Sequence, residues 1–235
     1  ASAMLHFDAS KYWLSQFDGD YMTEMRMKES QLTTGIKVLD SKLGTRAQMY
    51  RSPCFYLSLN KPSDENNGEL IAGTLAWSGN FQCSFEVDQQ NGLRMISGMN
   101  PYASEYKLQP GKTFETPVFI FTYTKKGKGE ASRNLHRWAR NYGVLDGNKP
   151  RLTLLNNWEA THMDFNQDVL VELFDGANKL GVDLFLLDDG WFGNKYPRDA
   201  DKTALGDWQV DKKKLPSGLG YLVNEASKKN LQFGI

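Results

Sequence analysis

The stretch Val182-Asp183-Leu184-Phe185-Leu186-Leu187-Asp188-Asp189-Gly190-Trp191-Phe192 decides the fold of the second half of the chain. Its first six residues form a near-continuous apolar run, which is typical of a strand covered on both faces in a parallel sheet. Amphipathic helices are predicted on both sides: one over 167–180 that ends at Gly181, and one from the candidate N-cap Ser217 to Asn230. A strand between two such helices is the repeating unit of an α/β fold.

Two further apolar segments, 152–155 and 231–235, complete the order strand–helix–strand–helix–strand, which predicts a parallel sheet. A TIM (β/α)8 barrel takes about 250 residues, whereas 85 residues follow Pro150. We therefore expect the first two and a half βα units of a truncated barrel. Because the chain ends inside an apolar strand, we also expect it to be a fragment of a longer protein. A small open sheet is the alternative.

The first half of the chain has the period of two that is typical of half-buried strands. Apolar Phe81, Cys83, Phe85 and Val87 alternate with polar residues, and Asn91-Gly92 then supplies a hairpin turn. Segments 53–59, 70–77 and 117–123 are also predicted to be strands, and such closely spaced strands favour an antiparallel β-sandwich. Cys83 lies on the apolar face of its strand, so we interpret it as a core residue; Cys54 is interpreted in the same way.

A predicted helix over 130–142, with Gly143 as a left-handed stop, separates the two halves. The polar segment 146–150 follows it. The chain is therefore predicted to be a multi-domain protein, β and then α/β: a β-sandwich over 1–128, a linking helix and connector over 129–150, and the start of a barrel over 151–235.

The composition excludes several classes of partner and cofactor. With 28 basic and 28 acidic residues the formal net charge is zero, which argues against nucleic acid as a partner. No apolar run reaches the roughly 20 residues needed to cross a membrane, so no membrane partner is expected. Three histidines and two cysteines at these spacings predict no metal site, and no cofactor is expected. The N-terminus has no signal-peptide pattern, which leaves the compartment open between cytoplasm and periplasm.

The residues that suggest chemistry follow the predicted parallel strands, where ligands meet α/β folds. Carboxylates accept hydrogen bonds from sugar hydroxyls, and indole rings cover the apolar face of a sugar. The candidate sugar-binding residues are Asn157, Trp158, Asp188, Asp189, Trp191, Asp207 and Trp208. Structural interpretations remain open: a turn for the two adjacent aspartates, core aromatics for Trp158 and Trp191, and a packed loop for Asp207-Trp208. A phosphate-binding domain is disfavoured because no glycine-rich loop follows the first strand.

Four motifs occur in the order and at the spacing of one enzyme family. They are Asn156-Asn157-Trp158-Glu159-Ala160, Leu187-Asp188-Asp189-Gly190-Trp191-Phe192, Leu205-Gly206-Asp207-Trp208 and Lys214-Leu215-Pro216-Ser217-Gly218-Leu219. Together they resemble the bacterial α-galactosidases of glycoside hydrolase family 36. The sandwich half also resembles that family, whose members carry a large β-sandwich before the catalytic barrel.

The resemblance implies retaining hydrolysis of terminal α-linked galactose in oligosaccharides of the melibiose and raffinose type, by a homo-oligomeric parent protein. In the family, the nucleophile and the acid/base are aspartates on later strands, the nucleophile within a Lys-Trp-Asp motif. That motif is absent from this sequence, so the catalytic pair is expected beyond Ile235 and the chain alone is expected to be inactive. Asp188 and Asp189 would bind the galactose 4- and 6-hydroxyls, and Trp158 would form an apolar wall. A non-catalytic carbohydrate-binding protein, or an inactive relative, is the alternative.

Overall fold

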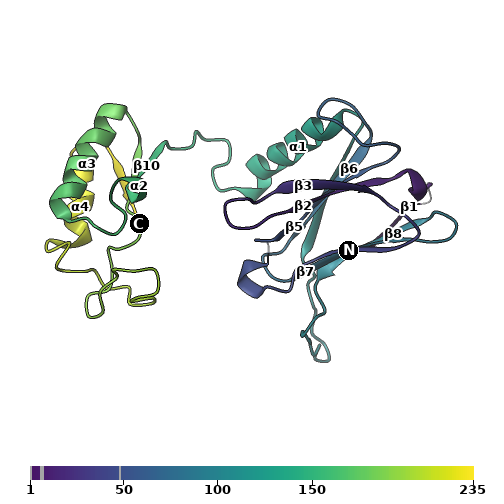
Figure 1. Ribbon diagram of the computed structural model, residues 1–235, viewed down its shortest axis with the longest axis horizontal. Helices are drawn as coiled ribbons and strands as arrows, with labels where there is room; N and C mark the ends of the chain where they lie inside the picture. The colour runs from purple at the N-terminus through teal and green to yellow at the C-terminus, as the bar shows by residue number, and fades with distance from the viewer. Residues whose placement is uncertain (1, 6–7, 48) are drawn as a thin grey trace. The chain divides into compact units, whose positions relative to one another are not determined.

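The computed structural model describes residues 2–5, 8–47 and 49–235, and it divides the chain into two units, Ala1–Asn148 and Lys149–Ile235 (Figure 1). Among the described residues, no helix is long and apolar enough to span a membrane.

Two antiparallel sheets make up the strands described in the first unit. The four-stranded sheet has the order β1-β8-β7-β4 and comprises β1 (Ser2–Leu5), β4 (Gly35–Asp40), β7 (Phe81–Val87) and β8 (Leu93–Met99). The five-stranded sheet has the order β3-β2-β5-β6-β9 and comprises β2 (Trp13–Asp18), β3 (Arg26–Gln31), β5 (Arg51–Ser58), β6 (Leu70–Ala76) and β9 (Val118–Thr124). Short 3₁₀ turns occupy Ala9–Lys11 and Gly44–Arg46.

Apolar side chains from the two sheets share one core, which confirms the predicted sandwich. Phe55 of β5 and Phe85 of β7 are fully buried, and their rings meet edge to face with centroids 4.9 Å apart. The alternation of β7 has the expected phase, since every second residue from Phe81 to Val87 is buried. This core holds the first unit together because burial of apolar area is the dominant favourable term in folding.

The β7–β8 connection is the hairpin that Asn91-Gly92 predicts. Asn91 has φ +60°, and the Asp88 carboxylate accepts hydrogen bonds from the backbone N–H groups of Gln90 and Gly92. Burial raises the pKa of the Cys83 thiol, and burial likewise raises the pKa of Cys54 to about 11. Both thiols are therefore protonated at neutral pH, which agrees with their interpretation as packing residues.

Helix α1 (Gly127–Trp138) lies against the five-stranded sheet, where Ala131 packs with Leu70 and Ala72 of β6 (Figure 1). A π-helical turn, Ala139–Gly143, continues it, so the prediction of a helix over 130–142 is confirmed. The predicted left-handed stop at Gly143 is wrong. Gly143 does not adopt a positive φ, and the π-helical turn instead closes with a hydrogen bond from the Val144 N–H to the Ala139 carbonyl.

The second unit contains the parallel sheet β10-β11-β12, built from β10 (Leu154–Asn156), β11 (Leu184–Leu186) and β12 (Gln232–Gly234). Helices α3 (Gln167–Leu180) and α4 (Gly218–Ser227) lie side by side and share a core with the sheet (Figure 1). The predicted strand–helix order is confirmed. Each strand is only three residues long, shorter than the apolar runs that predicted it.

The ends of the two helices differ in how well the sequence predicts them. Helix α3 has the predicted bounds: the Asn166 side chain caps its first turn, and Gly181 adopts φ +74° after its last residue. Helix α4 begins after Ser217 as expected, but the Ser217 side chain makes no capping hydrogen bond. A short helix, α2 (Trp158–Thr161), follows β10 directly and positions the first of the candidate site residues.

Candidate functional site

The site lies where β10 and β11 end, and hydrogen bonds tie the two strand ends together. The Asn156 amide donates from Nδ2 to Asp188 Oδ2 over 2.6 Å. The backbone N–H of Asp188 donates to Asn157 Oδ1 over 2.8 Å. Because the two strands are parallel neighbours, residues 32 positions apart in sequence meet at one edge of the sheet.

Asn157 is a buried residue that holds Asp188 in place through a hydrogen bond. Its two side-chain polar atoms are both in use: Oδ1 accepts from Asp188, and Nδ2 donates to Thr161 Oγ1 over 2.9 Å. In this structure Asn157 therefore braces Asp188. Trp158 is half-buried at the start of α2. Its backbone N–H donates to Asn156 Oδ1, and its indole ring lies edge-on to the ring of His162.

Asp188 and Asp189 are both half-buried, but they differ in the partners of their carboxylates. Asp188 accepts one bond at each oxygen, from the Asp189 N–H and from Asn156. Asp189 is more fully occupied: Oδ1 accepts from the Gly190 N–H and from Arg198 Nε, and Oδ2 accepts from Arg198 Nη2 over 2.6 Å. Hydrogen bonds from Arg198 lower the pKa of the Asp189 carboxyl below its ordinary value, so Asp189 is ionised at neutral pH.

Arg198 is a residue of the candidate site that sequence reasoning missed. Arg198 is buried, with only 6% of its surface exposed to solvent. Besides Asp189, its guanidinium donates to the carbonyls of Ala200 and Thr203, each over 2.8 Å. The guanidinium lies 5.6 Å from the ring centroid of buried Phe192, and its bonds with Asp189 raise its pKa. Two adjacent carboxylates at a strand end do signal a nearby cation. The loop offers Lys195, Arg198 and Lys202, however, and nothing in the sequence selects among them.

Lys214 holds the backbone next to the two aspartates in place. The Lys214 ammonium donates to the carbonyls of Met163 (2.6 Å) and Gly190 (3.0 Å), and so joins two loops. Gly190 has φ +97°, and a Cβ there would lie 3.1 Å from the Met163 backbone. A glycine is needed at this position because a side chain would be strained and would push the two loops apart.

Three aromatic rings gather next to the site. The Phe192 centroid lies 4.7 Å from that of Trp208 and 5.2 Å from that of Trp191, and the two indoles are 6.5 Å apart. The loop folds back on itself here, since the Asp211 N–H donates to the Trp191 carbonyl over 2.9 Å. Trp191 packs partly against the core, whereas Trp208 is 66% exposed. The structure thus joins Trp191 and Trp208 in one aromatic cluster.

Asp207 lines a separate hollow of about 520 Å³, together with Tyr196, Asp199, Thr203 and Leu205. Its Oδ2 atom is buried and has no hydrogen-bond partner among the described residues. A buried carboxylate oxygen without a donor is costly. The loop encloses this oxygen, so Oδ2 itself has no surface open to a ligand in this structure.

Comparisons with known proteins bear on both units. The model of the glycosyl hydrolase family 36 N-terminal domain matches residues 1–109, and the model of the melibiase family matches residues 113–235. The chain belongs to glycosyl hydrolase family 36. This confirms the family that the four motifs suggest.

Several family 36 relatives align along the whole chain. It is 35% identical to the α-galactosidase AgaA of Geobacillus stearothermophilus and 34% identical to the α-galactosidase Mel36A of Lactobacillus acidophilus. Each alignment covers 100% of this chain and 32% of the relative, so the chain spans about a third of their length. The crystal structure of AgaA superposes with a TM-score of 0.91 over 99% of this chain and 32% of that one. Variants of AgaA have been crystallised with raffinose and with stachyose.

Proposed function

We propose that the full-length protein containing this chain is a retaining α-galactosidase, and that this chain supplies its galactose-binding carboxylates. The observation that carries the proposal is the orientation of Asp188 and Asp189 at the ends of parallel strands. Asn156 and Asn157 hold Asp188 by hydrogen bonds, and Arg198 holds Asp189. Support also comes from family 36 membership and from the complexes of AgaA with raffinose and stachyose.

The hydrogen bonds already present define what the pair can bind. A carboxylate offers about four acceptor positions. The bonds within the chain leave roughly one position on Asp189 and two on Asp188. All of these are acceptors, so the ligand must present hydrogen-bond donors, as neighbouring sugar hydroxyls do. In the proposed complex, these are the 4- and 6-hydroxyls of galactose.

The aromatic residues supply the apolar part of the proposed site. Trp158 forms a wall against the C–H face of the sugar, and the cluster of Trp191, Phe192 and Trp208 borders the pair. Asp207, which lines a separate hollow with Tyr196 and Leu205, would bind a more distant hydroxyl of an oligosaccharide. α-Galactoside oligosaccharides are thus the proposed partners. We also propose that the full-length protein is a homo-oligomer.

The chemical step is proposed to use residues outside this chain. Retaining hydrolysis needs one carboxyl group as nucleophile and another as proton donor, about 5–5.5 Å apart. Asp189 is a poor proton donor because Arg198 keeps it ionised. We propose that β10, β11 and β12 are the first strands of a (β/α)8 barrel and that the catalytic pair follows Ile235. This chain alone should therefore not hydrolyse a nitrophenyl α-galactoside.

The decisive experiment compares the full-length protein with its Asp189→Asn variant on a nitrophenyl α-galactoside. Loss of a charge-assisted hydrogen bond should lower kcat/KM by about 10- to 150-fold. Added azide should not restore turnover, because azide replaces a missing nucleophile and not a hydrogen bond to a hydroxyl. Formation of a galactosyl azide would identify Asp189 as the nucleophile. Galactose binding without turnover by the unaltered protein would instead support the carbohydrate-binding alternative.

A further inference from the structure

From the contacts of Arg198 we infer that it is a positioning residue for substrate binding: it fixes the Asp189 carboxylate so that its one open acceptor position, on Oδ2, faces the sugar. The inference rests on the proposed α-galactosidase function and goes beyond it, because Arg198 itself need not touch the substrate.

The geometry favours orientation over simple charge neutralisation. The Nε and Nη2 atoms of Arg198 each contact a different oxygen of Asp189, at 2.9 and 2.6 Å, so the two planar groups are locked together. A carboxylate held at only one oxygen could rotate about its last bond. The Gly190 N–H adds a third bond at Oδ1, which leaves Oδ2 as the oxygen with room for a ligand.

Arg198 is in turn held from two sides. Its Nη1 donates to the carbonyls of Ala200 and Thr203, and the Thr203 hydroxyl contacts Asp199 and Ala200, so the loop 198–203 is closed around the guanidinium. Phe192 lies under the guanidinium and also packs against Trp208. The rotamer of Arg198 is therefore set before any ligand arrives, and this lowers the cost of ordering Asp189 on binding.

A purely structural role for Arg198 makes a different prediction. If Arg198 only stabilised the loop, its loss would reduce the amount of folded enzyme, and the remaining enzyme would bind substrate with an unchanged KM. If Arg198 positions Asp189, the folded variant should bind substrate poorly. The KM of the folded fraction therefore separates the two roles.

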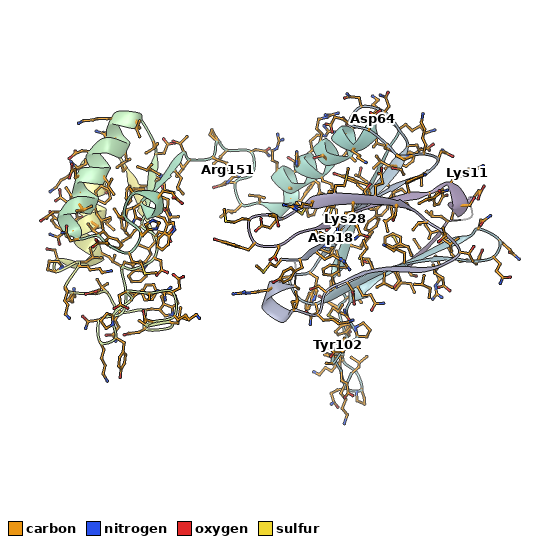
Figure 2. All side chains as sticks on the ribbon, in the orientation of Figure 1. Lys11, Asp18, Lys28, Asp64, Tyr102 and Arg151 are labelled. Carbon is orange, nitrogen blue, oxygen red and sulfur yellow. The ribbon has the colours of Figure 1, made fainter. Side chains whose placement is uncertain are left out.

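The experiment uses the full-length protein and three variants: Arg198→Ala, Asp189→Ala and the double variant. Arg198→Ala should raise KM for a nitrophenyl α-galactoside by roughly 10-fold or more, because a loosened carboxylate loses most of its hydrogen bond to the sugar. In the Asp189→Ala background, Arg198→Ala should cause no further rise in KM, because the residue acts through Asp189. Arg51→Ala is the matched control. Arg51 also pairs with an aspartate, Asp18 of the sandwich, which in turn contacts Lys28 (Figure 2), and its loss should leave KM unchanged.

Chemical rescue gives a second readout that loss of folding cannot imitate. Guanidinium at about 50 mM, far below denaturing concentrations, should lower the KM of Arg198→Ala toward that of the unaltered enzyme. Methylammonium, which lacks the planar fork, should rescue much less. Arg198→Lys keeps the positive charge without the two-point contact, so the KM of this variant should also be raised. If Arg198→Ala does not fold, the KM of Arg198→Lys tests the positioning role in its place.

The outcomes separate this inference from the proposed function. No turnover by the unaltered full-length protein would overturn both. A normal KM for Asp189→Ala would overturn the assignment of the site. If Asp189→Ala binds poorly but folded Arg198→Ala and Arg198→Lys keep a normal KM, or if the two effects multiply in the double variant, the positioning role of Arg198 is wrong and the proposed function stands.

Discussion

Asp189 keeps its negative charge in mild acid because Arg198 donates two hydrogen bonds to it, and this has a consequence for stability. The pKa of the Asp189 carboxyl is lowered in the folded chain relative to its ordinary value of 3.8. A lowered pKa in the folded state contributes stability above the unfolded value, and that stability is lost as pH falls through the lowered pKa.

We predict that the difference in free energy of unfolding between the unaltered chain and Asp189→Asn is largest above about pH 4 and shrinks below it. At low pH the protonated aspartic acid resembles the asparagine that replaces it. Urea titrations between about pH 2 and pH 6 measure the difference, with Glu159→Gln on the exposed side of α2 as the control. A difference that stays constant across this range would mean that Arg198 does not stabilise the ionised form.

Among the secondary-structure elements, helices α3 and α4 offer a matched test of N-capping. The Asn166 side chain accepts hydrogen bonds from the backbone N–H groups of Asp168 and Val169, whereas the Ser217 side chain makes no such bond. Asn166→Ala should therefore destabilise the second unit by about 1 kcal/mol. Ser217→Ala should change the free energy of unfolding by less than about 0.5 kcal/mol. Urea unfolding followed by circular dichroism compares the two, and equal losses would contradict the difference in capping.

The two units of the chain should also differ in stability. The first has two sheets packed on one core, whereas the second depends on three strands of three residues, of which β10 and β12 are edges. Edge strands leave backbone groups unpaired, and short parallel strands are weakly protected.

We therefore predict faster amide hydrogen exchange in β11 than in β7 when the whole chain is measured under native conditions. The amides of α1 in the first unit and α3 in the second provide a helical comparison that does not depend on strand length. Protection in β11 equal to or greater than that in β7 would contradict the expectation that the second unit is an incomplete part of a barrel.

The sequence by itself determined the features that depend on neighbours a few residues apart. The alternation from Phe81 to Val87, the turn at Asn91-Gly92, and the left-handed stop at Gly181 each follow from local geometry. The same reasoning placed Asp188 and Asp189 at a strand end. It failed at Gly143, because a glycine permits a left-handed stop without requiring one, and the chain closes there through a π-helical turn.

Only the tertiary structure decided which side chains meet. Asn157 braces Asp188 across 31 positions, Lys214 joins Met163 to Gly190, and Arg198 rather than Lys195 or Lys202 pairs with Asp189. Such partners depend on how loops close over a sheet, and many closures are compatible with the same local preferences. Residue types could therefore predict a carboxylate site at the strand ends, but the positions of the charges and the open acceptor positions follow from packing.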